Sequence, residues 1–390
     1  MFPSTLAVES RPGRGRCLVA TAAIPANTLL FLSAPATFFP SSNSTCGACL
    51  SPKAPSRCKT CKAVSYCDST CQKRGWPDHK HECAMLKAFL ARPTECEPDV
   101  WLPMLTMARL YRGLSLAGGG AAPTTATTPA LHIPTLEDFR ALQNPAAAGA
   151  EGLDKKASVL GLAATVVALG RTLELFPPSI SDETLAGDFH RLRLNNFMPT
   201  DAMLVPVGVG AYPAAALMNH SCRPNVCLSY GLSGTTEWPV EGGPSASVSS
   251  VAPVDLRPCM AVRTLTPLAP GEEVCHAYLD ISLPLHERAS DLASRYGFKC
   301  DCPACKEERE TAGSSGGGGS GSSEEVNVVL QRGRLMVLQS RVFATEPELP
   351  GEDLFERQAC LCFPLALLHT NPPPTYTPNP PSPLQAPLRY

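Results

Sequence analysis

The alternation of hydrophobic and polar residues predicts two β-rich segments. Near the N-terminus, the β-prone runs Cys17 to Ala20 and Thr28 to Leu32 are separated by a Pro-Ala-Asn turn and preceded by a glycine turn. Much further along, Met203 to Tyr230 and Pro258 to Tyr278 alternate apolar runs with turns. We expect the chemistry of the protein to lie in this second segment.

Helices are predicted between the two β-rich segments. The pattern is mostly helical from Ala84 to about Leu116, with further helices at about Thr135 to Ala141, Lys155 to Phe176 and Asp182 to Leu194. The longest apolar run, Val159 to Gly170, is shorter than the roughly 20 residues that a membrane span needs. It predicts a buried helix, and no membrane segment is expected.

Segments of low complexity interrupt the pattern and are predicted to be exposed or flexible. The last of them is almost pure glycine and serine, and a short helix over residues 324 to 344 and an extended proline-rich tail are expected after it. The low-complexity segments are residues 117 to 135, 145 to 152, 233 to 254 and 313 to 323.

Length and charge limit the classes of protein. A chain of 390 residues predicts two or three modules, and its 44% hydrophobic residues suffice for packed cores. The net charge of −2 gives no field that would hold a polyanion, so direct binding of nucleic acid is not expected. A monomer with a protein or small-molecule partner is the better prediction.

The N-terminal residues and the cysteine content indicate the compartment. Residues 1 to 10 lack the basic start and apolar core of a secretory signal, which predicts an intracellular protein of the cytoplasm or the nucleus. Eighteen cysteines in a reducing compartment are not expected to form disulfides, and several of them stand in C-x-x-C pairs. Metal binding is therefore predicted.

A cysteine-rich block lies between Cys46 and Cys83. Its spacing, C-x2-C-x8-C-x2-C-x5-C-x3-C-x7-H-x3-C, supplies eight ligands, enough for two tetrahedral zinc sites. The alternative, a small domain held by disulfides, requires an oxidising compartment. The eight candidate ligands are Cys46, Cys49, Cys58, Cys61, Cys67, Cys71, His79 and Cys83.

A second group of cysteines, Cys300, Cys302 and Cys305, has the spacing C-x-C-x2-C and lacks one ligand for a closed zinc site. Cys222 follows an apolar run in a segment that resembles a turn, which makes it a candidate for the fourth ligand. The alternative is a small buried hydrophobic residue, because free cysteine is among the most buried residue types. Spacing alone leaves both interpretations open.

The first block carries the residues of a known zinc finger. They are Cys46-Gly-Ala-Cys49, Arg57-Cys58-Lys-Thr-Cys61, Tyr66-Cys67, Cys71-Gln72, Trp76-Pro77-Asp78-His79-Lys80 and Glu82-Cys83. In this order they resemble the MYND finger. The resemblance implies interleaved binding of two ions, one by Cys46, Cys49, Cys67 and Cys71 and the other by Cys58, Cys61, His79 and Cys83. It also implies a protein-binding module, with a proline-rich peptide as a possible partner.

Five further motifs lie on both sides of the finger. They are Arg14-Gly15-Arg16-Cys17-Leu18-Val19-Ala20, Gly208-Val-Gly-Ala-Tyr212-Pro213, Asn219-His220-Ser221-Cys222-Arg-Pro224-Asn225, Gly271-Glu272-Glu273-Val274 with Tyr278, and Cys300 to Cys305. In this order they resemble a SET domain split by a MYND finger, as in the SMYD family. Cys17 departs from the pattern, because the family usually has glycine there.

The resemblance implies an α+β fold: a β-rich SET domain split by a MYND zinc finger, a helical insert, a cysteine-rich post-SET segment, and a disordered linker and C-terminal tail. The predicted domains are listed in order. They are residues 1–45 (first part of the SET domain), 46–83 (MYND finger), 84–181 (helical insert), 182–285 (SET catalytic core, with insertion 233–254), 286–306 (post-SET zinc segment), 313–323 (linker) and 324–390 (short helix and tail).

The resemblance further implies a protein-lysine N-methyltransferase that uses S-adenosylmethionine and three zinc ions, the third held by Cys222, Cys300, Cys302 and Cys305. Tyr278 is the implied catalytic residue and, with Phe197 and Tyr296, walls the lysine channel. His276 is expected to face away from this pocket, and Glu272 and Glu273 to mark a turn. The implied contacts of the methyl donor are Arg14, Arg16, Asn195, Asn219, His220, Tyr278 and Phe298. The alternative is a catalytically inactive adaptor that binds proteins through its finger.

Overall fold

The computed structural model describes residues 2–91, 98–116, 131–143, 153–201, 205–231 and 258–314. The predicted insertion, short helix and C-terminal tail lie outside these residues, as do most of the predicted linker and three of the cysteines, Cys96, Cys360 and Cys362. The predicted domain boundaries stay predictions.

Strands and helices alternate along the described residues, which confirms the predicted α+β class. The strands are β1 (Leu6–Arg11), β2 (Gly15–Ala20), β3 (Leu29–Ser33), β4 (Thr37–Pro40), β5 (Ser56–Arg57), β6 (Ser65–Tyr66), β7 (Leu131–His132), β8 (Asn196–Phe197), β9 (Gly208–Ala211), β10 (Asn219–His220), β11 (Val226–Gly231), β12 (Cys259–Thr264) and β13 (Cys275–His276). The helices are α1 (Ser69–Ala91), α2 (Pro98–Leu116), α3 (Leu136–Arg140), α4 (Leu153–Thr172), α5 (Asp182–Leu194), α6 (Leu285–Asp291) and α7 (Pro303–Ser314), with a 3-10 turn (Ala215–Leu217) and a π-helical turn (Leu292–Tyr296).

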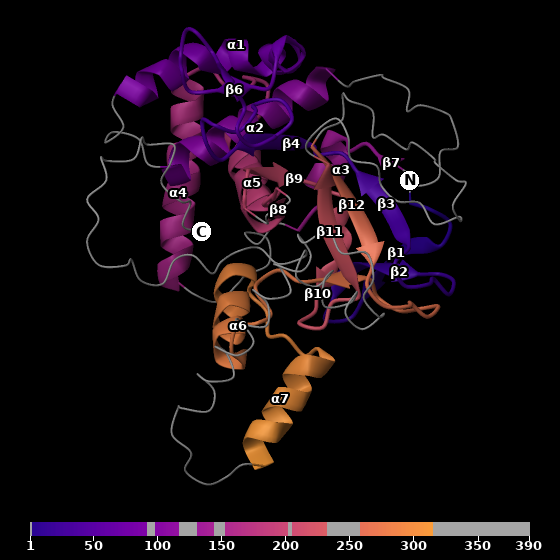
Figure 1. The fold of residues 1–390 in the computed structure, drawn as a ribbon. Coiled ribbons are helices and arrows are strands. Elements are labelled where there is room, and N and C mark those ends of the chain that lie inside the picture. The colour runs from indigo at the N-terminus through magenta and orange to yellow at the C-terminus, as the bar shows by residue number, and fades with distance from the viewer. Residues whose placement is uncertain are drawn as a thin grey trace, which may run out of the picture. The chain divides into compact units, whose positions relative to one another are not determined.

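The first of two compact units comprises the described residues of 1–31, 217–229 and 261–314. Its N-terminal part is the antiparallel hairpin of β1 and β2, in which Leu6 lies opposite Ala20. Gly13 and Gly15 flank Arg14 with φ of 70° and 67°, in the left-handed region that glycine adopts without strain. In the same unit, β10 and β13 run parallel and bring Asn219 opposite Cys275. Figure 1 labels β1, β2 and β10 of this unit together with α6 and α7.

The second unit comprises the described residues of 32–216, 230–231 and 258–260. It holds a three-stranded antiparallel sheet in the order β4-β9-β8 and a parallel pairing of β3 with β7. Helices α2, α4 and α5 contact one another, as Figure 1 shows. They bury a core that includes Met104, Leu105, Tyr111, Phe176 and Phe189.

The predicted elements are found with small shifts at their ends. Helices α3, α4 and α5 occupy the predicted ranges, and Thr135 and Ser181 cap α3 and α5 by accepting backbone N–H groups. Helix α1, by contrast, begins at Ser69 inside the finger and continues through Gly75 and Pro77. These two residues weaken a helical pattern in the sequence, which is why the first half of α1 was not predicted.

Among the described residues, no helix is both long enough and apolar enough to cross a membrane. The longest apolar run lies within α4 and is helical as predicted, but it is buried on one face only. Ala163, Val166 and Val167 are buried, whereas Leu160 is 48% exposed.

Candidate functional site

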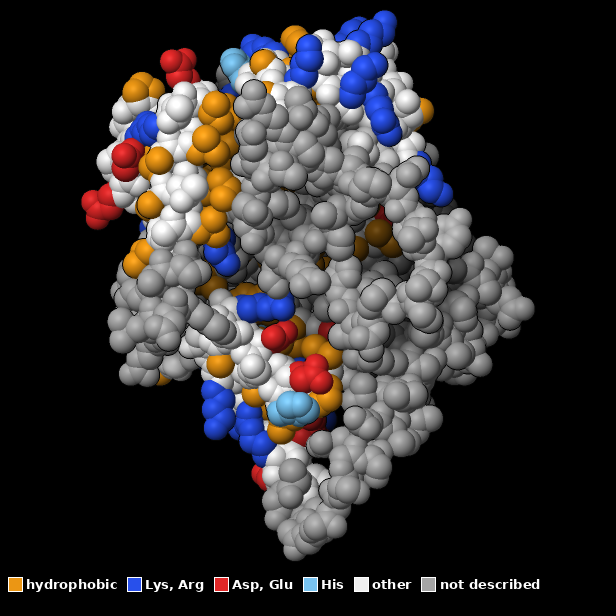
Figure 2. All heavy atoms as spheres, turned by 90° about the vertical axis from the view of Figure 1, so that its left-hand side faces the viewer, with side chains coloured by type: hydrophobic (Ala, Val, Ile, Leu, Met, Phe, Trp, Pro, Cys, Tyr) orange, Lys and Arg blue, Asp and Glu red, His pale blue; other side chains and the backbone are white. Residues whose placement is uncertain are grey.

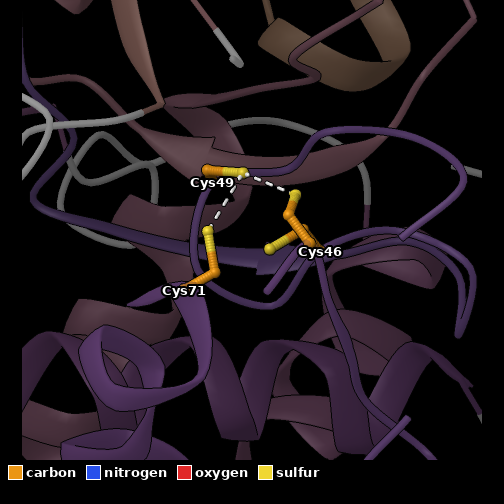
Figure 3. Close-up of side chains that lie close together, drawn as sticks. Cys46, Cys49 and Cys71 are labelled. Atoms are coloured by element: carbon orange, nitrogen blue, oxygen red, sulfur yellow. Dashed lines mark hydrogen bonds between the residues drawn. The ribbon is translucent and has the colours of Figure 1, made fainter. Parts of the chain in front are cut away.

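Three groups of four metal-binding side chains are present in the described part of the chain, and each is one of the predicted tetrads. Within each group, the ligand atoms all lie within 4.8 Å of one another. In the first group, Cys46 and Cys49 come from the loop after β4, and Cys67 and Cys71 follow β6. The Sγ atoms of Cys49 and Cys67 are 3.6 Å apart, and Figure 3 shows the thiols of Cys46, Cys49 and Cys71 pointing toward one another.

The second group joins the β5–β6 hairpin to α1. Cys58 lies 3.8 Å from Cys83 (Sγ to Sγ), and Cys61 Sγ lies 3.5 Å from Nε2 of His79. Burial, and to a smaller extent the charge of Arg109, lower the pKa of His79 to about 4, so the ring is neutral, as metal binding requires. His81, two residues away, is exposed and takes no part.

The third group settles the position of Cys222. It lies with Cys300, Cys302 and Cys305 in one buried cluster, and its Sγ is 3.5 Å from that of Cys305, which α7 carries. Arg309, also on α7, donates to the carbonyl of Cys300 at 2.6 Å. Cys222 is therefore buried because it faces three other thiols, which favours the ligand interpretation over that of an isolated small hydrophobic residue.

The donor sets fit zinc. Zn–S bonds of about 2.3 Å in a tetrahedron place neighbouring sulfurs about 3.8 Å apart, and the separations above lie between 3.5 and 3.8 Å. The alternative of a disulfide-held domain is not supported, because all cysteines among the described residues are free thiols. The three tetrads would hold three structural zinc ions.

A buried ion pair braces the finger. Glu82, which lies between the ligands His79 and Cys83, is fully buried, and its carboxylate accepts from Nε and Nη2 of Arg109 on α2 at 3.0 and 2.8 Å. The Arg109 guanidinium also lies 4.3 Å from the centre of the Phe39 ring. Glu82, which lies between the two ligands in the sequence, is thereby held to helix α2.

The tyrosine implied as catalytic, Tyr278, is held by one short segment of the first unit. Its hydroxyl donates to the carbonyl of Met218 at 2.9 Å, and its backbone N–H donates to Nδ1 of His220 at 3.0 Å. Met218 directly precedes β10, and Tyr278 follows β13, so the parallel pairing of these strands brings the two segments together. Burial, followed by the neighbouring Tyr296, raises the pKa of Tyr278 well above its ordinary value, so its hydroxyl stays protonated.

Aromatic rings surround Tyr278 within the same unit. The ring centres of Tyr296 and Phe298 lie 4.9 and 6.4 Å from that of Tyr278, and His220 lies 5.3 Å away. The structure thus groups Tyr278, Tyr296, Phe298 and His220, which the sequence separates by up to 78 positions. We call these four side chains the aromatic cage; the faces of aromatic rings attract cations such as an alkylammonium group.

The prediction that His276 faces away from this group was wrong. Its ring centre lies 4.8 Å from that of Tyr278, because residues two apart in an extended segment share a face. Only 6% of His276 is exposed, and burial, with the nearby His220, lowers its pKa to about 3. The period of two along β13 was the signal that could have placed it.

Two of the residues predicted to contact the methyl donor, Arg14 and Asn219, are hydrogen-bonded to Glu273. Arg14 donates from Nε and Nη2 to the two carboxylate oxygens at 3.0 and 3.1 Å, and Asn219 donates to the same carboxylate at 2.7 Å. Asn219 also donates to the backbone carbonyl of Arg14 at 3.1 Å. Arg16 is exposed on β2. Glu273 was expected only to mark a turn, and sequence reasoning missed its role as the partner of both residues.

The remaining predicted residues, Asn195 and Phe197, belong to the second unit. Asn195 ends α5 and donates to the carbonyl of Arg191 at 2.8 Å, and Phe197 on β8 packs edge to face on Tyr212 with ring centres 5.9 Å apart. Their contacts with a methyl donor and with the lysine channel stay predictions.

Comparison with known proteins agrees with the motifs. The family model of the MYND finger matches residues 43–83. Over 307 residues the chain is 28% identical to histone-lysine N-methyltransferase SMYD3 of Mus musculus and of Homo sapiens, covering 77% of this chain and 61% of each relative. It is 28% identical over 299 residues to N-lysine methyltransferase SMYD2 of Homo sapiens, covering 75% and 58%.

A solved SET domain of LSMT bound to lysine and AdoHcy aligns with 92% of this chain and 85% of that chain, at 13% identity and a TM-score of 0.35. The curated relatives and the finger model confirm the predicted resemblance to SET and MYND domain proteins. The chain spans about three-fifths of the length of the curated relatives that it matches.

Proposed function

We propose that this protein transfers methyl groups from S-adenosylmethionine to lysine side chains of protein substrates. The observation that carries the proposal is Tyr278, whose hydroxyl is fixed at 2.9 Å to Met218 within a cage of Tyr296, Phe298 and His220. The similarity to curated lysine methyltransferases supports it. An intracellular protein that acts on other intracellular proteins is the corresponding biological proposal.

The chemistry requires positioning more than a reactive side chain. The amine nitrogen attacks the methyl carbon as the carbon–sulfur bond breaks, so the positive charge moves from sulfur to nitrogen. The Tyr278 hydroxyl donates to Met218, which leaves its oxygen free to accept from the amine and orient its lone pair. Precise alignment of two reactants contributes up to about 7 to 11 kcal/mol, and the aromatic faces favour the cationic product by about 0.5 to 2 kcal/mol per contact.

No residue of the cage is required as a general base. A lysine loses its proton more readily where burial and a neighbouring positive charge disfavour the ammonium form. In this proposal the methyl donor supplies the electrophilic methyl group and contacts Arg14, Arg16, Asn195, Asn219, His220, Tyr278 and Phe298. Glu272 and Glu273 are engaged in structural contacts with Asn225, Arg14 and Asn219.

A second function, binding of a partner protein by the finger, is favoured by the surface of α1. Half of the Trp76 side chain is exposed there, and Lys73 and Lys80 are exposed on either side in sequence. Figure 2 shows lysine and arginine side chains along the top of the view, where Figure 1 places α1. An aromatic side chain among cations suits a proline-rich peptide with acidic residues.

The first experiment measures transfer of labelled methyl from S-adenosylmethionine to a protein extract by the full chain and by Tyr278→Phe. We expect labelled lysine, identified by mass spectrometry, and a loss of about a hundredfold in the variant, the cost of misplacing a reactant by about 1 Å. Tyr230→Phe, a partly buried tyrosine of the second unit, is the matched control and is expected to retain activity.

Binding of S-adenosylmethionine distinguishes the methyltransferase function from the adaptor function. If the wild-type chain binds S-adenosylmethionine in calorimetry but Tyr278→Phe transfers methyl as well as wild type, the role of Tyr278 is wrong. If the wild-type chain neither binds the donor nor transfers label, the methyltransferase proposal fails and the adaptor function remains.

A further inference from the structure

His220 makes one contact with each of two sites. Its Nδ1 accepts the backbone N–H of Tyr278 at 3.0 Å, and its Nε2 lies 3.3 Å from Sγ of Cys222, a member of the third cysteine tetrad. Only 1% of the residue is exposed, so no solvent competes for either ring nitrogen. The one ring therefore bridges a zinc tetrad and the tyrosine of the proposed reaction.

The two contacts fix where the ring carries its proton. A backbone N–H can only donate, so Nδ1 must present its lone pair to Tyr278 and cannot be protonated. A neutral imidazole has one N–H, which is then on Nε2 and points at Cys222. A thiolate that binds a metal accepts such a hydrogen bond, and the bond directs the thiolate toward the ion.

We propose that His220 is a positioning residue that couples the zinc site of Cys222, Cys300, Cys302 and Cys305 to Tyr278. Its Nε2–H bond holds the Cys222 sulfur, and through the same ring its Nδ1 holds the backbone of Tyr278. The Tyr278 hydroxyl donates to the carbonyl of Met218, two residues before His220. The backbone and the hydroxyl of the tyrosine are therefore both hydrogen-bonded to the segment from Met218 to His220. A disturbance at the zinc is thereby passed to the tyrosine through one rigid ring.

The surroundings of His220 support rigid coupling. Its ring packs 5.3 Å from that of Tyr278 and 6.1 Å from that of Phe298, centre to centre. Its backbone belongs to β10, which is paired with β13, and the N–H of the next residue, Ser221, donates to the His276 carbonyl at 3.1 Å. The ring and the backbone of His220 are therefore each held by contacts within the first unit.

Two substitutions separate the two halves of the proposal. In His220→Asn, the side-chain oxygen reaches the position of Nδ1 but nothing reaches Cys222. In His220→Gln, the side-chain amide reaches the position of Nε2 but no acceptor remains at Nδ1. The exposed His286 on α6 provides the control His286→Asn.

The readouts are zinc release from the zinc-loaded full chain to a chromogenic chelator, and kcat with KM for methyl transfer. We expect one of three zinc ions to leave His220→Asn about tenfold faster, as for other residues that orient a ligand, with a smaller loss in kcat. His220→Gln should lower kcat more and keep zinc release near that of wild type. Equal zinc release from His220→Asn and wild type would overturn the coupling.

A measurement on the wild-type chain needs no folded variant. In nitrogen-15 spectra of histidine-labelled protein, the His220 ring is identified by ring-proton contacts with both Tyr278 and Phe298. We expect the neutral Nε2–H form, and the Nδ1–H form would contradict the proposal. The catalytic consequence rests on the proposed function, whereas zinc release and the ring form do not, so a chain without methyl transfer but with these two results refutes only the proposed function.

Discussion

Glu273 shows at the scale of single residues how function depends on contacts distant in sequence. The motif predicted a turn at Pro270 and Gly271, and Gly271 does adopt a positive φ of 82°. Beyond this turn, however, Glu273 receives hydrogen bonds from Arg14, 259 positions earlier, and from Asn219. The carboxylate therefore fixes two side chains that the proposed methyl donor would contact.

Glu273→Gln tests this arrangement. The amide keeps the shape but replaces the charge-assisted pairing with Arg14, and hydrogen bonds to charged groups contribute about 1.5 to 3 kcal/mol. We expect S-adenosylmethionine to bind about tenfold more weakly in calorimetry, equivalent to about 1.4 kcal/mol. Glu272→Gln is the control, because Glu272 contacts Asn225 and the Ala269 backbone instead. Equal donor affinity in both variants would show that the Arg14 pairing does not matter for binding.

At the scale of elements, the finger depends on a helix that its sequence disfavours. Helix α1 carries Gly75 and Pro77 in its interior, each of which destabilises a helix. It persists with the ligands Cys71, His79 and Cys83 on it and with Glu82 paired to Arg109 of α2. Metal ligation and a buried ion pair supply the order that local propensity does not.

The prediction for this element concerns Arg109→Met. Removing the arginine leaves the Glu82 carboxylate buried with a single remaining arginine partner, Arg112, and breaking a buried pair costs about 3 to 5 kcal/mol. We expect the midpoint of urea unfolding of the zinc-loaded chain to fall and the finger zinc to be released faster. Arg109→Lys keeps the charge but cannot donate two parallel hydrogen bonds to the carboxylate. Its unfolding midpoint should lie between those of Arg109→Met and wild type. Unfolding midpoints that agree within error would refute the bracing role.

At the scale of the whole molecule, histidines whose pKa is lowered by full or partial burial make stability depend on pH. Burial lowers the pKa of His132 and His190 in the second unit and of His220 and His276 in the first. The value for His276 is about 3, against 6.5 for an unperturbed side chain. Because the unfolded chain then binds more protons between about pH 6.5 and 3, stability falls as the pH falls through this window.

His276→Gln should remove the contribution of this one histidine to the pH dependence of stability. For one histidine that stays neutral in the folded state, the free energy of unfolding falls by about 1.4 kcal/mol between pH 7.5 and 5.5. We expect urea unfolding at the two pH values to show a decrease smaller by this amount in the variant than in wild type. A decrease of the same size in both would mean that His276 is not kept neutral by the fold.

Much of the fold and the site could be predicted because their signals are local. The C-x-x-C pairs, the periodicity of α4 and α5, and the glycine turn before β2 are each contained within a few residues. The two predictions that failed, the start of α1 and the orientation of His276, also failed for local reasons. Gly75 and Pro77 interrupt the helical pattern of the first half of α1. His276 was expected to face away from the pocket, although the period of two in an extended segment puts it on the same face as Tyr278.

The sequence by itself determined which side chains could bind metal and in what order the motifs follow, since these depend only on residue type and spacing. The tertiary structure alone decided that Arg14 pairs with Glu273 and that His220 faces both Cys222 and Tyr278. Such contacts arise when strands such as β10 and β13 pair, and no pattern within either strand specifies its partner.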